Sequence, residues 1–420
     1  MPQNKKQTII KSVIYLSVAL FATIMYANLS SDNLYEENNI SIDIVNKPNS
    51  VDTSLQTNIK QITKNTQEKL SADEVIVVAM NSQTGKVLSF VSSNENNETN
   101  QLANDCKNIP INAFRYEFEP GDIMKPITIS MALDLNITKT TDMFDAYNGG
   151  TPDANGTYPR GAYPISEKFK ILDPDRFKTN TISVEDIVVH SSNIGTLQIG
   201  NKLKAAQMIQ GLYSFGFTKP TMKDLSCEQI GSLQSYSRMS YGEDSGRVNI
   251  FKVTAAYGQG MLANFMQLVK AYSAFSNNGV VVDPKLDHFG IYNSFHQTQG
   301  TKVISSSVAN YMKSLLVKSY MLNTNQEKMD GGIKGLTMGG SLGVGVIDNK
   351  SNQNGDTIRY LNSFVGFVND KSNNNYVIGI SVRNPKSDKH SYVEMSKTTL
   401  PLFKDVALEL VKSGYLKATE

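Results

Sequence analysis

The chain has 420 residues, of which 40% are hydrophobic and 19% charged, so it can bury a sizeable core in one large domain or in two or three smaller ones. Its 41 basic and 39 acidic residues leave a net charge of +2, and nothing in this balance indicates nucleic acid as a partner. Two cysteines, Cys106 and Cys227, exclude a disulfide framework and a zinc site, although an exported chain could pair them. The four histidines show no ligand spacing, so we expect no metal site.

Residues 12–29 form an uncharged, mostly apolar run that follows several lysines. The run is just long enough to cross a bilayer, and the basic residues before it predict that residues 1–11 are cytoplasmic and that the rest of the chain is exported. A cleaved signal peptide is the alternative, but the run is longer than a usual signal core and no clean cleavage site follows it. The polar residues 30–50 predict a tether to a globular domain over 51–420.

The globular part opens with a helical pattern and then two apolar, β-branched runs, which predict a β-hairpin around the turn at 81–85. A helix from about Pro120 to Leu135 is apolar on nearly all sides, as is typical of a buried helix. Residues 264–277 show the clearest amphipathic pattern, and Gly279 ends it. The other expected elements are helices over 55–70, 183–203 with a break at 190–193, 305–320 and 401–411, and strands over 333–345, 358–368 and 376–383.

The predicted order is therefore two strands, many helices, three strands and one helix. The early and late strands must share one antiparallel sheet, with the helices packed on its faces. This order predicts the α+β class, with a five-stranded antiparallel sheet flanked by helices and one N-terminal transmembrane helix in front of it.

Several motifs resemble those of one known family. FEPGDIMKP (118–126) is similar to the segment that carries the S-x-x-K motif of penicillin-binding proteins, and HSSNIG (190–195) to their S-x-N motif in its class B form. Residues 256–279 resemble the long helix that follows the second motif, and residues 360–385 the last strand pair. Because the segments occur in family order over about 50–415, the resemblance implies the transpeptidase fold shared by penicillin-binding proteins and serine β-lactamases.

In that family the serine of the first motif attacks a peptidoglycan stem peptide ending in D-Ala-D-Ala, and a lysine one turn later removes its proton. The resemblance places Asp122 at the serine position and Lys125 at the lysine position. A carboxylate forms no stable ester, and an anion three residues from an amine favours the protonated form of that amine. Loss of the nucleophile costs about a million-fold in turnover. The plain structural alternative is that Asp122 caps the helix and forms an ordinary salt bridge with Lys125.

The second motif places Ser191 and Asn193 where the family relays protons and binds the substrate backbone. The structural alternative for this pair is a polar turn between two helices. The third motif, K-T-G, belongs on the strand near 335–341 in one of two registers, over 336–338 or over 338–340 followed by Ser341. Neither register supplies a lysine.

We prefer the second register, which assigns Met338, Gly340 and Ser341 to substrate binding, although Met338 could simply pack in the core. The glycine-rich run 339–345 lacks the G-K-[ST] ending of a phosphate loop, so we expect an edge strand there.

The sequence thus predicts a non-catalytic class B penicillin-binding protein of the inner membrane that acts in wall synthesis or division as a scaffold or regulator. The resemblance implies a polytopic peptidoglycan glycosyltransferase, divisome proteins and the stem peptide as partners, with no cofactor, metal or nucleic acid. One alternative is an active D,D-transpeptidase or carboxypeptidase that binds penicillin and uses another nucleophile, for which Ser130 and Ser191 are candidates. A sensor that binds muropeptide or β-lactam without acylation is the third reading.

Overall fold

The computed structural model describes residues 52–94, 112–165, 167, 169–222, 225–245, 247–286, 300–324, 332–352, 355–386 and 392–419. The chain divides into two units, Met1–Asn49 and Ser50–Glu420, and the described residues belong to the second. The predicted membrane anchor, the tether and Cys106 therefore lie outside the described residues. Among the residues that the structure does describe, no helix has both the length and the apolar character needed to span a bilayer.

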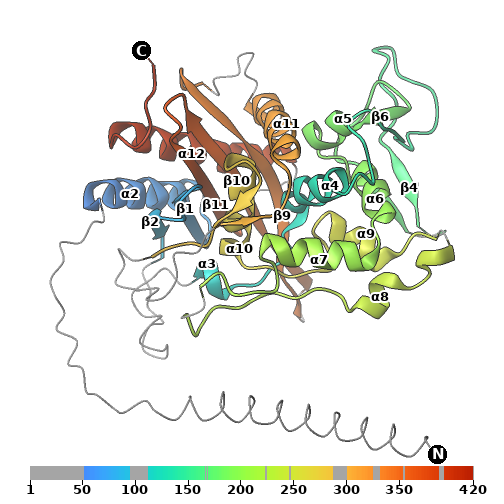
Figure 1. Ribbon diagram of the computed structural model, residues 1–420, viewed down its shortest axis with the longest axis horizontal. Coiled ribbons are helices and arrows are strands. Elements are labelled where there is room, and N and C mark those ends of the chain that lie inside the picture. Colours follow the sequence, from blue (N-terminus) through green and yellow to red (C-terminus); the bar gives the residue numbers. More distant parts are fainter. Residues whose placement is uncertain are drawn as a thin grey trace, which may run out of the picture. The chain divides into compact units, whose positions relative to one another are not determined.

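A five-stranded antiparallel sheet forms the centre of the second unit (Figure 1). The strand order is β2-β1-β11-β10-β9, so the N-terminal hairpin lies beside the last strand of the chain. Strand β1 pairs with β11 along its whole length, from Glu74 opposite Arg383 to Asn81 opposite Tyr376. The predicted sheet is confirmed. Its strands are β1 (Glu74–Asn81), β2 (Val87–Ser92), β9 (Leu336–Asn352), β10 (Gly355–Asp370) and β11 (Asn375–Arg383).

Helices cover both faces of the sheet (Figure 1). On one face, α2 (Thr53–Leu70) and α12 (Tyr392–Lys412) pack on the strands through a cluster that includes Val77 and Phe364. On the other face, α10 (Phe265–Ser276) and α4 (Met124–Asp134) belong to a second and larger cluster. The remaining helices are α3 (Asn112–Arg115), η4 (Gly121–Ile123), α5 (Val184–Val189), α6 (Asn193–Lys202), α7 (Ala205–Phe215), α8 (Tyr236–Ser240), η5 (Glu243–Ser245), α9 (Ile250–Ala256) and α11 (Ser306–Thr324).

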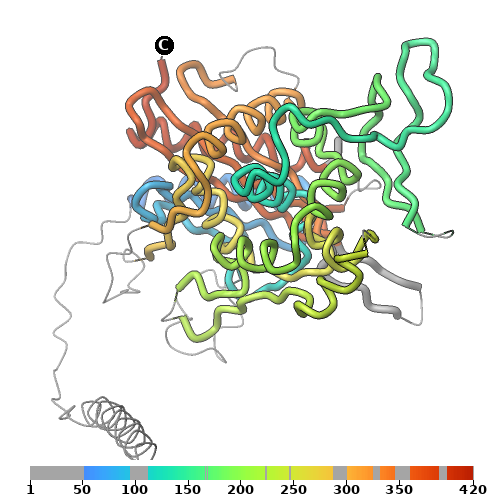
Figure 2. Tube along the Cα trace, turned by 45° about the vertical axis from the view of Figure 1, so that its right-hand side comes forward, coloured from blue at the N-terminus to red at the C-terminus, as the bar shows by residue number. Residues whose placement is uncertain are grey.

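Three short strand pairs lie outside the main sheet and were not expected from the sequence. Two of them belong to the segment between α4 and α5, which projects from the body at the upper right of Figure 2. Strands of two or three residues carry too little periodicity to be recognised in a sequence. The pairs are β3 (Met143–Asp145) with β6 (Thr181–Ser183), β4 (Ala162–Pro164) with β5 (Lys170–Leu172), and β7 (Val280–Val281) with β8 (Thr301–Lys302).

The structure corrects two helix predictions. Helix α10 is not amphipathic, because all twelve of its residues are buried. Its polar members have partners inside the protein: Lys270 pairs with Asp283 at 2.5 Å, and Gln267 donates to the carbonyl oxygen of Ile230 at 2.9 Å. Helix α12 begins at Tyr392 and not at Pro401, which lies inside it. Proline is common in the first turn of a helix, so the sequence pattern indicated a later start.

Candidate functional site

The site lies where the first turn of η4 meets the edge strand β9. Two glycines allow this close approach. Gly121 has φ +60°, and a Cβ atom there would lie 2.2 Å from the carbonyl oxygen of Val344 in β9. Gly258, just after α9, has φ +80°, and its carbonyl oxygen accepts a hydrogen bond from the Gly121 amide at 3.0 Å. A positive φ together with such close backbone contacts requires glycine, and the contact between Gly121 and Gly258 fixes the backbone directly before Asp122.

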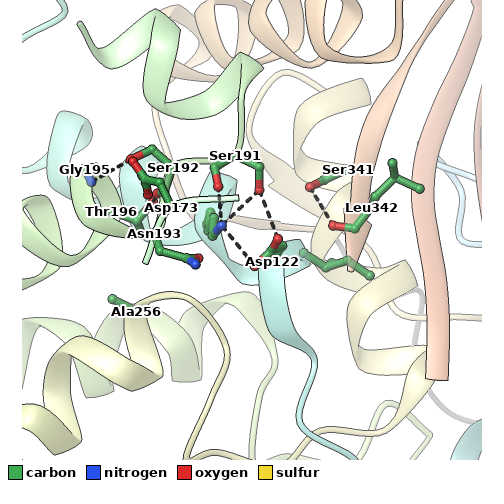
Figure 3. A network of polar contacts seen from close by, with 12 residues as sticks. Asp122, Asp173, Ser191, Ser192, Asn193, Gly195, Thr196, Ala256, Ser341 and Leu342 are labelled. Carbon is green, nitrogen blue, oxygen red and sulfur yellow. Dashed lines mark hydrogen bonds and ion pairs between the residues drawn. The ribbon is translucent and has the colours of Figure 1, made fainter. Parts of the chain in front are cut away.

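Asp122, Lys125 and Ser191 form one polar network (Figure 3). The Nζ atom of Lys125 lies 3.0 Å from Oδ1 of Asp122, and it donates to the carbonyl oxygen of Ser191 at 2.5 Å and to its Oγ at 3.0 Å. The Ser191 hydroxyl in turn donates to Oδ2 of Asp122 at 3.2 Å. Lys125 is buried, and its three N–H donors match these three oxygen acceptors.

Asp122 does not cap the helix, which corrects part of the plain structural interpretation. Pro120 occupies the N-cap position of η4 and Ile123 that of α4, and neither position has a side-chain cap. Asp122 lies inside the first turn, so its carboxylate points to Lys125 and Ser191 and not to the free N–H groups. The predicted salt bridge between Asp122 and Lys125 is confirmed, and the Lys125 side chain is buried.

Ser191 lies in the turn between α5 and α6 and has φ +55°, a left-handed conformation that is uncommon for a serine. The predicted break between these helices is therefore confirmed. The hydroxyl of Ser192 caps α6 by accepting from the Gly195 amide at 2.9 Å. The amide of Asn193 donates to the carbonyl oxygen of Leu172 at 2.7 Å, and its Oδ1 is buried without a hydrogen-bond partner.

Two further groups at the site were missed in the sequence. Asp173 is buried and accepts from the Ser192 hydroxyl at 2.8 Å and the Ile194 amide at 2.9 Å. Burial raises the pKa of Asp173, although the bonds from Ile194 and Ser192 and the charge of Lys125 oppose the rise. Burial also raises the pKa of Tyr257 to about 12, and the charge of Asp122 adds to the rise. No sequence signal reveals these two, because both reach the site through tertiary packing.

Strand β9 presents alternate residues to the site, and this alternation corrects the preferred register. Met338 is fully buried in the cluster under α2 and α12, on the far face of the sheet, so the structure does not bring it to the site. Ser341 and Gly343 lie on the opposite face, and a Cβ atom on Gly343 would lie 2.8 Å from the carbonyl oxygen of Pro120. Gly340 shares the face of Met338 and is covered by Phe364. Of the three assigned residues, only Ser341 faces the site.

Of the two serines considered as alternative nucleophiles, Ser191 alone lies in the network around Lys125. Ser130 is fully buried, and its hydroxyl donates to the carbonyl oxygen of Ile127 at 2.8 Å within α4. Ser191 is the other candidate hydroxyl, and it already donates to Asp122. The stretch 336–345 of β9 contains no lysine or arginine to bind a substrate carboxylate. Within the described ranges no three His, Cys, Asp or Glu side chains lie close enough to share a metal ion.

Comparison with known proteins gives a consistent assignment. A family model described as the penicillin binding protein transpeptidase domain matches residues 75–406. The chain is 26% identical over 363 residues to peptidoglycan D,D-transpeptidase FtsI of Buchnera aphidicola, covering 83% of this chain and 56% of that protein. It is 25% identical over 354 residues to stage V sporulation protein D of Bacillus subtilis, covering 80% and 49%. The chain thus spans about half the length of these two relatives.

Solved structures show the same fold. The transpeptidase domain of Burkholderia pseudomallei penicillin-binding protein 3 superposes with a TM-score of 0.65 at 23% identity, covering 87% of this chain and 96% of that one. A peptidoglycan synthetase from Bifidobacterium adolescentis superposes with a TM-score of 0.67 at 20% identity, covering 88% and 62%. At these identities the similarity supports the fold alone.

Proposed function

This chain belongs to the class B penicillin-binding protein transpeptidase family, and from that premise we propose that it is a non-catalytic member that serves peptidoglycan synthesis or division as a scaffold or regulator. One observation carries the proposal: Asp122, which by resemblance stands at the position of the family's attacking serine, is ion-paired with Lys125, which by the same resemblance stands at the position of the activating lysine.

The ion pair removes both halves of the acylation chemistry. Asp122 offers no hydroxyl, and an anhydride formed from its carboxylate would hydrolyse far faster than an ester. Lys125 donates to three oxygen atoms, so its nitrogen has no lone pair with which to accept a proton from a nucleophile. The absence of a lysine or arginine from the stretch 336–345 of β9 weakens binding of a substrate carboxylate as well. Losses at two independent points of one site favour a protein that no longer performs the reaction.

The proposed location is the inner membrane, with residues 12–29 as a single anchor and the domain on the outer side. The lysines before the apolar run support this orientation. Cys227 is disulfide-bonded, which is usual for a domain in an oxidising compartment and rare in the cytosol. We propose a polytopic glycosyltransferase and other division proteins as partners, because a scaffold of this family would act on the enzymes that build the wall.

Labelling of the full chain with a fluorescent penicillin tests the proposal. We expect no covalent adduct after denaturing electrophoresis, whereas a family member with an intact serine is labelled under the same conditions. A serine-linked adduct on this chain would overturn the assignment.

A second candidate function rests on Ser191. Its hydroxyl donates to Asp122 at 3.2 Å, so Asp122 has the geometry of a general base for this hydroxyl in an active D,D-transpeptidase or carboxypeptidase. Release of D-Ala from a synthetic pentapeptide, abolished by Ser191→Ala and retained in Ser130→Ala, would support this enzyme over the scaffold. The short contacts from Lys125 to both oxygens of Ser191 favour the scaffold, because they direct the hydroxyl into the network.

A further inference from the structure

The Ser191 turn, which we define as residues 190–194, controls the environment of Lys125. Ser191 alone provides two of the three acceptors of the Lys125 ammonium, its carbonyl oxygen and its Oγ. Both point to Lys125 while Ser191 has a left-handed backbone, which a non-glycine residue adopts only where its surroundings impose it. The contacts that impose this conformation therefore decide whether Lys125 keeps its partners.

Asp173 provides the most buried of these contacts. It directly follows β5, and its carboxylate accepts from the Ser192 hydroxyl at 3.0 and 2.8 Å and from the Ile194 amide at 2.9 Å. Asp173 is 1% exposed, so these bonds form away from water. A buried carboxylate that binds the residues one and three positions after Ser191 fixes the course of the chain on that side of the turn.

The same short segment also contacts the other residues of the turn. The carbonyl oxygen of Leu172 accepts from Asn193 at 2.7 Å, and Oδ2 of Asp175 lies 2.9 Å from Nδ1 of His190. The ring of Phe177 packs edge-on against His190. Residues 172–177 thus contact the four residues of the turn that flank Ser191, and Ser191 faces Lys125.

We propose that Asp173 is a positioning residue that holds the Ser191 turn against Lys125 and thereby maintains the ion pair between Lys125 and Asp122. The inference concerns the regulation of the proposed site and rests on the proposed function, in which this ion pair keeps the site from acylation. Any event that withdraws Asp173 from the turn, such as movement of the β4–β5 hairpin that precedes it, would release the ammonium of Lys125 to a ligand.

The test measures how readily Lys125 reacts. The full chain and its Asp173→Ala variant are acetylated briefly with an amine-reactive ester, and peptide mass spectrometry gives the modified fraction of each lysine. We expect acetylation of Lys125 to rise about tenfold or more in the variant, the effect of losing one charge-assisted hydrogen bond. Asp173→Asn keeps one acceptor oxygen, so its increase should be smaller.

Lys252 is the matched control. It is also buried, it donates to the carbonyl oxygens of Asn201 and Leu203, and it pairs with Glu243 at 3.1 Å, all through contacts in which Asp173 takes no part. A rise at Lys125 with no change at Lys252 supports the proposal. Equal reactivity of Lys125 in wild type and variant overturns it, and so does a parallel rise at both lysines, which would make Asp173 a purely structural residue.

Failure of this inference can be told from failure of the proposed function. Fluorescent penicillin applied to the same wild-type sample reports on acylation, whereas acetylation of Lys125 reports on the turn. An adduct with penicillin together with selective release of Lys125 in Asp173→Ala would refute the non-catalytic assignment and leave the role of Asp173 standing.

Discussion

Replacing Asp122 by serine should restore covalent binding of penicillin to a site that otherwise has none. The change removes the anion next to Lys125 and places a hydroxyl where, by the proposed correspondence of motifs, the family carries its attacking serine. Lys125 keeps its two contacts to Ser191, so it remains directed at residue 122 after the substitution. We therefore expect slow but measurable acylation of the Asp122→Ser variant.

The expected rate of acylation of Asp122→Ser depends on the groups that this variant still lacks. Loss of a nucleophile costs about a million-fold, and the serine restores that part. The stretch 336–345 of β9 carries no lysine or arginine, and a charge-assisted hydrogen bond to a ligand carboxylate contributes about 1.5–3 kcal/mol. This difference corresponds to a rate of acylation about 10- to 150-fold below that of a site with the cation. Because Ser341 faces the site, adding Ser341→Lys to Asp122→Ser should recover this factor.

The assay is the rate of labelling by a fluorescent penicillin, followed by gel for the full chain and its variants. Asp122→Asn is the matched control, because it removes the same charge without adding a nucleophile, and it should stay unlabelled. Adding Met338→Lys in place of Ser341→Lys should give no gain, since Met338 lies on the far face of the sheet. Failure of Asp122→Ser to react at any rate, in a folded protein, would refute the reasoning that one residue blocks the site.

Three further predictions concern stability. Met338→Lys alone should destabilise the protein by about 3 kcal/mol or more, because it places an unpaired charge in the core, whereas Met338→Leu should be nearly neutral; thermal unfolding distinguishes them. Gly121→Ala should lower the free energy of unfolding by about 2 kcal/mol or more, because its Cβ would clash with the carbonyl oxygen of Val344. Gly149→Ala is the control and should have little effect, because a Cβ atom at Gly149 meets no other atom within 4 Å. Burial raises the pKa of Asp173, so the folded protein binds the proton of this carboxyl more tightly than the unfolded chain does. The free energy of unfolding of the wild type, relative to that of Asp173→Asn, should therefore fall as pH rises from about 4 through the pKa of the folded state. Above that pKa the difference should stay level. Urea denaturation across this range would contradict the prediction if the difference were constant or grew in favour of the wild type.

Much of the fold could be predicted because its elements carry strong local patterns. The β-branched runs of β1 and β2 around a turn indicated the hairpin, and the apolar run of α4 indicated a buried helix. Helix α10 was located correctly from Asn264, whose side chain caps it, but its burial on all sides was not recognised. The polar residues of α10 suggested a solvent-exposed face, although each of them forms a hydrogen bond or ion pair in the interior of the protein.

The site was predicted less completely, because its geometry depends on which face of an element a residue occupies. Asp122 and Lys125 were paired correctly, since residues three apart on a helix lie side by side. The assignment of Met338 and Gly340 to the site was wrong, because a glycine-rich strand has no polar–apolar alternation that would tell from the sequence which residues face the site. Asp173 could not be found, because 18 positions separate it from Ser191 and only the folded chain brings them together.

The central claim is that this chain cannot form an acyl-enzyme. Intact mass spectrometry of the full chain, after hours with a large excess of benzylpenicillin at neutral pH, tests it directly. We expect the mass of the wild-type chain to stay unchanged, while the Asp122→Ser variant, treated in parallel, gains the mass of one opened lactam. A shift of that size in the wild-type chain would contradict it.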